Sequence, residues 1–172
     1  MHNINLNIET GEPKWNNCSD DIEDLSKQIL KAVFDYVKKN ENIDFLSFGK
    51  PISVGLALSN DTEIKKLNRD FGDKDSATNV LSFASVDDEN FYDDIELFKE
   101  IELGDIIISF DTLEKEAKEK NISFINHYTH LFIHGILHLL GFDHIKDDEA
   151  DYMEDFEINI LKTFNINNPY AE

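Results

Sequence analysis

Three histidines in the last third of the chain have the type and spacing of metal ligands: His134, His138 and His144. His134 and His138 are four residues apart, so a helix places both imidazoles on one face, one turn apart. This spacing allows both rings to reach one zinc ion at ~2.0–2.1 Å. Gly141 can end the helix and let the chain turn, which brings His144 back towards the same ion. Three nitrogen ligands plus water make an open, catalytic zinc site.

Each histidine alone has a plainer interpretation, a hydrogen-bonded side chain in the core. Three on these spacings, within the largely apolar stretch 131–142, favour the metal instead, because unpaired buried imidazoles are costly. We expect one Zn²⁺ per chain, although nickel, copper and iron ions also accept imidazole ligands. His130 precedes His134 by four residues and is expected to support a ligand or line the cleft, whereas His127 is expected to be structural.

The histidine spacing equals that of the metzincin proteases, H-E-x-x-H-x-x-G-x-x-H. In those enzymes the glutamate after the first histidine is the general base that activates water. Gly135 stands at that position here. The sequence therefore keeps the metal ligands of a zincin and lacks the base of a peptidase.

The elements that position these residues follow from hydrophobic periodicity. Strands are expected at 4–8, 51–58, 79–83 and 104–108, and helices at about 20–39, 60–71, from Asp111 onward, 123–140 and 147–164. Asp111 and Glu114 have the spacing of a capping pair. The acidic stretch 87–96 is expected to be an exposed loop. Because strands come early and helices dominate later, the fold class is α+β, with the histidine pair on the long helix.

Length, composition and charge limit the class of protein. A chain of 172 residues suits one domain, 1–172, and the single cysteine, Cys18, leaves no internal disulfide and fits the cytoplasm. No cationic leader and no apolar run of ~20 residues is present, so we expect no membrane association. The net charge of −20 repels nucleic acid at long range. No DNA partner is expected.

The chain also resembles the YbeY family of bacterial endoribonucleases. The resemblance covers about residues 60–160 and rests on LNRDFGDKDSATNVLSF at 67–83, LGDIIIS at 103–109, NHYTHLFIHG at 126–135, and HGILHLLGFDH at 134–144 followed by IKDDEADYME. It implies a small mixed sheet, here of four strands, packed by about five helices, with the metal site in a cleft. It further implies an endoribonuclease that matures the 3′ end of small-subunit ribosomal RNA and acts in ribosome quality control.

Carried over by position, the family's metal ligands are His134, His138 and His144, and its catalytic region includes Asp143. Asp143 either orients an imidazole or caps the turn. The family's arginine after the LN-containing helix is replaced by Gly72, and the sole arginine, Arg69, lies three residues earlier. Arg69 either supplies a guanidinium from the same helix face or is a solvated surface residue.

Three hypotheses follow. The first is metal-assisted hydrolysis of RNA, with ribosomal RNA precursors and the small subunit as partners. The second is a metal-dependent peptidase or amidase that uses a base at another position. The third is a non-catalytic, metal-stabilised ribosome-assembly factor. Because of the net charge, RNA binding is expected to be weak and strongly salt-sensitive.

Overall fold

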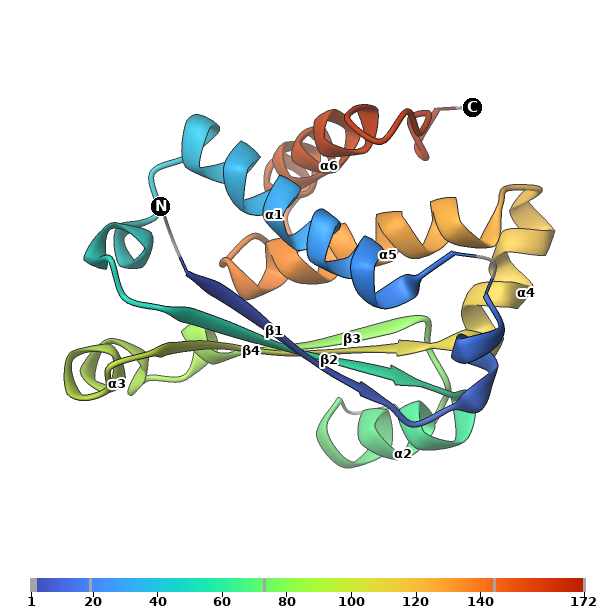
Figure 1. Ribbon diagram of the computed structural model, residues 1–172, viewed down its shortest axis with the longest axis horizontal. Helices are drawn as coiled ribbons and strands as arrows, with labels where there is room; N and C mark the ends of the chain where they lie inside the picture. Colours follow the sequence, from blue (N-terminus) through green and yellow to red (C-terminus); the bar gives the residue numbers. More distant parts are fainter. Residues whose placement is uncertain (1–2, 19, 73, 144, 172) are drawn as a thin grey trace.

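The computed structural model describes residues 3–18, 20–72, 74–143 and 145–171 (Figure 1). In chain order its elements are β1 (Ile4–Thr10), η1 (Pro13–Asn17), α1 (Ile22–Asn40), η2 (Asp44–Phe48), β2 (Ile52–Ser59), α2 (Asp61–Phe71), β3 (Val80–Ala84), η3 (Ser85–Asp87), α3 (Phe91–Leu97), β4 (Ile101–Ser109), α4 (Phe110–Lys120), α5 (Phe124–Leu139) and α6 (Asp147–Lys162). Among the helices of these ranges, none has the length and apolar character that crossing a bilayer requires.

The four strands form one mixed sheet in the order β1-β2-β4-β3. β1 pairs with β2 and β2 with β4 in parallel, whereas β3 runs antiparallel to β4. β4 is paired on both sides, and its residues Ile106 and Ile108 are fully buried. The α+β class with a small mixed sheet is confirmed. Six α-helices lie in the described residues where about five were expected.

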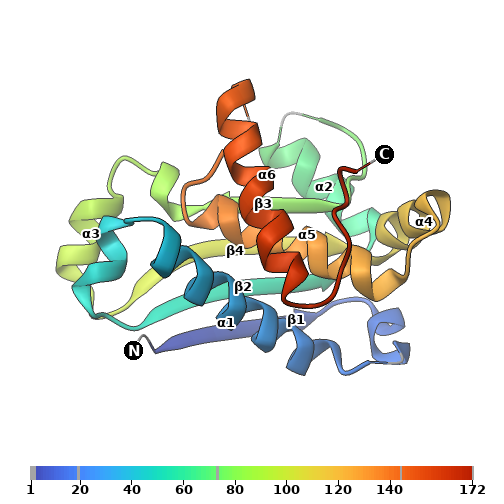
Figure 2. The same ribbon diagram turned by 90° about the horizontal axis from the view of Figure 1, so that it is seen from above.

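The helices are divided between the two faces of the sheet (Figures 1 and 2). α1, α5 and α6 cover one face, and α2 lies on the opposite side (Figure 1). α5 contacts β3 and β4 beneath it and α1, α4 and α6 around it. Its residues Phe132, Ile133 and Ile136 are fully buried. The helix predicted to carry the histidine pair is therefore packed against the sheet and three other helices.

The acidic stretch 87–96 is not the exposed loop that its charge predicted. It contains the end of η3 and most of α3, and Phe91 and Ile95 are both 3 % exposed. These two residues are four apart, so one helical turn directs both to the core. The ring of Phe91 meets Phe45 edge-on, with centroids 5.2 Å apart. The prediction was wrong because it weighed the acidic residues and not the apolar pair between them.

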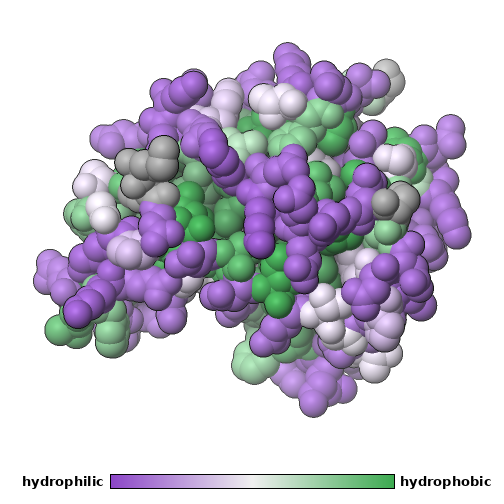
Figure 3. Space-filling model, viewed as in Figure 1, coloured by the Kyte–Doolittle hydropathy of each residue, from purple (hydrophilic) through white to green (hydrophobic). Residues whose placement is uncertain are grey.

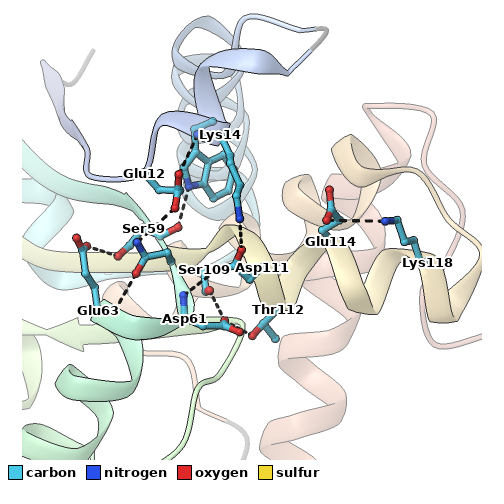
Figure 4. A network of polar contacts seen from close by, with 12 residues as sticks. Glu12, Lys14, Ser59, Asp61, Glu63, Ser109, Asp111, Thr112, Glu114 and Lys118 are labelled. Atoms are coloured by element: carbon cyan, nitrogen blue, oxygen red, sulfur yellow. Dashed lines mark hydrogen bonds and ion pairs between the residues drawn. The ribbon is translucent and has the colours of Figure 1, made fainter.

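Asp111 does not form the predicted capping pair with Glu114. α4 begins at Phe110, and the Asp111 carboxylate accepts hydrogen bonds from the Asp61 N–H at 3.1 Å and the Lys14 ammonium at 2.8 Å (Figure 4). Asp111 thus caps the first turn of α2 and anchors the segment before α1. Such a long-range partner is invisible to a local spacing rule.

Candidate metal centre

His134 and His138 lie on the last two turns of α5, with their ring centroids 4.5 Å apart and the ring planes at 85°. The two Nε2 atoms are 3.0 Å apart. Two zinc–nitrogen bonds of ~2.0–2.1 Å at the tetrahedral angle would set two nitrogens about 3.3 Å apart. The four-residue spacing therefore brings both rings to the separation that a shared ion requires.

The hydrogen bonds at the two Nδ1 atoms decide whether each Nε2 carries a proton or a lone pair. His138 Nδ1 lies 2.9 Å from the carbonyl oxygen of Phe142, and that oxygen only accepts, so Nδ1 donates. His134 Nδ1 lies 3.2 Å from Glu157 Oε2. In a neutral ring that donates from Nδ1, Nε2 keeps its lone pair. Two such acceptors 3.0 Å apart suit a cation between them, either a proton or a metal ion.

Glu157 on α6 is the carboxylate behind this pair, and its side chain is 1 % exposed. Burial alone would raise its pKa, but hydrogen bonds from His130 and His134 outweigh burial and lower the pKa to about 2. The ionised carboxylate can only accept, which supports Nδ1 of His134 as the donor. His130 Nε2 lies 2.5 Å from Glu157 Oε1. His130 thus contacts the same carboxylate as His134, and its predicted support of a metal ligand stays a prediction.

Sequence reasoning missed Glu157, although a signal was available. It lies on the buried stripe of α6 with Met153, Phe156, Ile160 and Leu161. A glutamate is almost never fully buried without a partner. A carboxylate on the apolar stripe of a helix that follows a histidine-bearing helix in the chain indicates a polar contact between the two helices.

A hollow of about 260 Å³ opens beside the two histidines, between β3 and the turn after α5. Gly141 has a φ of +101°, and its N–H donates to the His138 carbonyl at 3.0 Å, so it turns the chain at the helix end as predicted. Asp143 follows on this turn, is exposed, and lines the hollow together with His134 and His138. The predicted third ligand, His144, lies outside the described residues.

Arg69 is not brought to this hollow. It lies on α2, its side chain is 53 % exposed, and its Nε is 3.3 Å from Asp70 Oδ1. α2 instead borders a larger hollow of about 620 Å³ on the opposite face of the sheet, which Leu67, Phe71 and Ile107 help to line. Figure 3 shows this side of the molecule hollowed between α3 and α2. The catalytic role of Arg69 stays a prediction.

Gly135, which stands where a zincin has its glutamate, lies close to the sheet. A Cβ at this position would lie 3.0 Å from Ile106 Cγ2 and 3.2 Å from Ser82 Oγ. α5 therefore packs closely on β3 and β4 at the residue after His134. A longer side chain at this position would have to displace Ile106 or Ser82.

His127 contributes to the support of α5 and not to the hollow. It is 1 % exposed, and its Nε2 lies 2.9 Å from Glu116 Oε1, which also accepts from Asn79. Burial is the largest influence on its pKa and lowers it. The contacts tie α5 to α4 and to the start of β3, in keeping with the structural role predicted for His127.

The fold and the facing histidines define an α+β protein with a candidate metal centre, and comparisons with known proteins show its family. The sequence model of the family described as Endoribonuclease YbeY matches residues 8–165. A protein named Endoribonuclease YbeY from Francisella tularensis subsp. novicida is 44 % identical, over 100 % of this chain and 96 % of its own length. Another protein of that name, from Agrobacterium fabrum, is 34 % identical, over 99 % of this chain and 97 % of its own length. The chain belongs to the YbeY family.

A solved structure shares the fold. The solution structure of a Thermotoga maritima protein aligns with a TM-score of 0.53 and 22 % identity, over 97 % of this chain and 99 % of that one. This likeness supports the arrangement of helices and strands.

Proposed function

We propose that this member of the YbeY family is an endoribonuclease that uses one metal ion held by His134, His138 and His144. Zn²⁺ is the ion that we expect there. Family membership supports the endoribonuclease, since the matching family is described by that activity. The facing Nε2 atoms of His134 and His138 support the metal. This pair is the observation that carries the proposal.

The residues around the pair have defined parts in this proposal. A bound zinc ion would supply Lewis acidity, which activates water and polarises a phosphoryl oxygen. The Phe142 carbonyl and the Glu157 carboxylate hold the two rings in the required tautomer. Asp143, which lines the hollow, either orients an imidazole or caps the turn in this proposal. Gly135 leaves α5 without the glutamate base that a zincin peptidase uses, which disfavours the peptidase hypothesis.

The proposed substrate is single-stranded RNA in precursors of ribosomal RNA, on the small subunit in the cytoplasm. The net charge of −20 does not favour binding to naked RNA. We therefore expect weak, strongly salt-sensitive binding to isolated RNA and a gain in affinity from basic ribosomal proteins. Tight binding to arbitrary RNA at high salt would contradict this.

The test compares cleavage of single-stranded RNA and of casein by the purified protein, with and without chelator and added zinc. His138→Ala is expected to lose both bound zinc and RNA cleavage, because it removes a ligand. Asn126→Ala, on the exposed face of the same helix, is the matched control and is expected to keep both. Equal RNA cleavage by His138→Ala and the parent would refute the proposal. Co-sedimentation with small subunits by a metal-loaded protein that cleaves no RNA would favour the assembly factor instead.

A further inference from the structure

The carboxylate of Glu157 accepts hydrogen bonds from three side chains, two on α5 and one in the C-terminal segment. His134 Nδ1 lies 3.2 Å from one oxygen, and His130 Nε2 at 2.5 Å and the Tyr170 hydroxyl at 2.7 Å share the other. The Tyr170 ring also meets His130 edge-on, with centroids 5.5 Å apart. Because the carboxylate is buried, these contacts replace the water that would otherwise solvate it.

The contact with His134 selects between two states of the histidine pair. Nε2 of His134 keeps its lone pair only while the proton of the neutral ring stays on Nδ1. If that proton moved to Nε2, the 3.0 Å separation from His138 Nε2 would suit an N–H···N hydrogen bond within the pair. That bond would occupy both nitrogens and compete with a metal ion. An acceptor at Nδ1 of His134 therefore favours the state that binds metal.

Tyr170 reaches this carboxylate from the C-terminal segment. The chain leaves α6 after Lys162 and turns at Asn165, whose φ is +60°. The Ile166 N–H then donates to the Leu161 carbonyl at 3.1 Å, and Ile166 packs against the core. Figure 2 shows the segment running back beside α6. The end of the described chain thus reaches the carboxylate that also contacts His134.

We propose that Glu157 and Tyr170 are positioning residues of the metal centre. Glu157 holds His134 in the tautomer that offers Nε2 to the ion, and Tyr170 holds the Glu157 carboxylate in place. The inference rests on the proposed metal-dependent function. It assigns to α6 and the C-terminal segment a part in metal binding that the ligand motif does not contain.

The test uses the full chain with Glu157→Gln and Tyr170→Phe, each with a matched control. Asp155→Asn changes the charge of α6 equally at an exposed position, and Tyr152→Phe removes a hydroxyl of α6 that bonds to Glu41. The zinc dissociation constant is measured by competition with a chromophoric chelator. The His134 tautomer is read from ¹⁵N chemical shifts of the metal-free protein, and thermal unfolding reports folding.

Glu157→Gln is expected to weaken zinc binding by roughly 10–100-fold, the usual effect of losing a hydrogen-bond partner of a ligand. Tyr170→Phe is expected to weaken it by roughly two- to tenfold, since one neutral hydrogen bond is lost. Both controls should bind zinc like the parent. The metal-free parent should carry the His134 proton on Nδ1, and Glu157→Gln should shift it towards Nε2.

The outcomes separate this inference from the proposed function. A parent that binds no zinc would refute the metal-dependent function, while the tautomer measurement would still decide the role of Glu157. A folded Glu157→Gln with unchanged zinc affinity and an unchanged His134 tautomer would overturn the inference alone. If Glu157→Gln does not fold, Tyr170→Phe decides: an unchanged dissociation constant overturns the inference, and the predicted loss supports it.

Discussion

The close contact of Gly135 with the sheet makes a prediction about stability that can be worked out from the structure. In Gly135→Ala the new Cβ would meet Ile106 Cγ2 at 3.0 Å and Ser82 Oγ at 3.2 Å. Alanine favours the helix by about 1 kcal/mol over glycine. Overpacking a filled core costs about 1–3 kcal/mol. The net expectation is a loss of between zero and about 2 kcal/mol of stability, and not the gain that helix propensity alone predicts.

Equilibrium urea denaturation of the chelated protein measures this, since chelation removes any contribution of bound metal. The double variant Ser82→Ala with Gly135→Ala removes one of the two neighbours, so the alanine should then cost less, with a coupling of about 0.5–1 kcal/mol. Gly135→Glu should be destabilised by several kcal/mol, because it buries a carboxylate as well. Stabilisation by about 1 kcal/mol in Gly135→Ala would refute the close packing of α5 on the sheet.

Three further predictions concern the fold and the metal. Gly104→Ala should lose about 2–5 kcal/mol of unfolding free energy in urea denaturation, because φ is +131° and the Cβ would lie 2.0 Å from the Phe83 carbonyl oxygen. The control Gly49→Ala, at φ +70° in open space, should lose only about 1–2 kcal/mol. Equal losses in the two variants would contradict this prediction. The hydrogen bond from Lys14 lowers the pKa of Asp111. The ionised Asp111 carboxylate therefore contributes fully to the stability of the fold above about pH 4, and this contribution disappears as the pH falls through the lowered pKa. The thermal midpoint of Asp111→Asn should therefore fall less steeply below pH 4 than that of the parent, and an identical acid slope would speak against the Asp111 network. Excess chelator should lower the thermal midpoint of the zinc-loaded protein, because a ligand at 100 times its dissociation constant stabilises the folded state by about 2.7 kcal/mol. An unchanged midpoint would count against a resident metal ion.

Much of the fold was predictable because local rules are sufficient for long, periodic elements. The strands at β1, β2 and β3 and the helices at α1, α2 and α5 lie within a few residues of their predicted ranges. Asn60 caps α2 by accepting from the Glu63 N–H at 2.9 Å. Helical spacing also brought His134 and His138 together, since four residues is nearly one turn.

What the sequence did not reveal depends on contacts between distant residues. The buried pair Phe91 and Ile95 makes α3 helical only because Phe45 and the sheet supply a core for it. Asp111 serves another helix, and Glu157 serves a histidine 23 residues away in the chain. Each requires the folded arrangement before its partner can be named. The family motif predicted the ligands and did not contain the carboxylate of Glu157.

The central claim is that His134 and His138 share one metal ion through their Nε2 atoms. The most direct measurement is an anomalous difference map at the zinc edge from crystals of the zinc-loaded protein. The account predicts a single strong peak ~2.0–2.1 Å from both Nε2 atoms. A fully loaded crystal with no peak between these two rings, or with its zinc bound elsewhere, would contradict it.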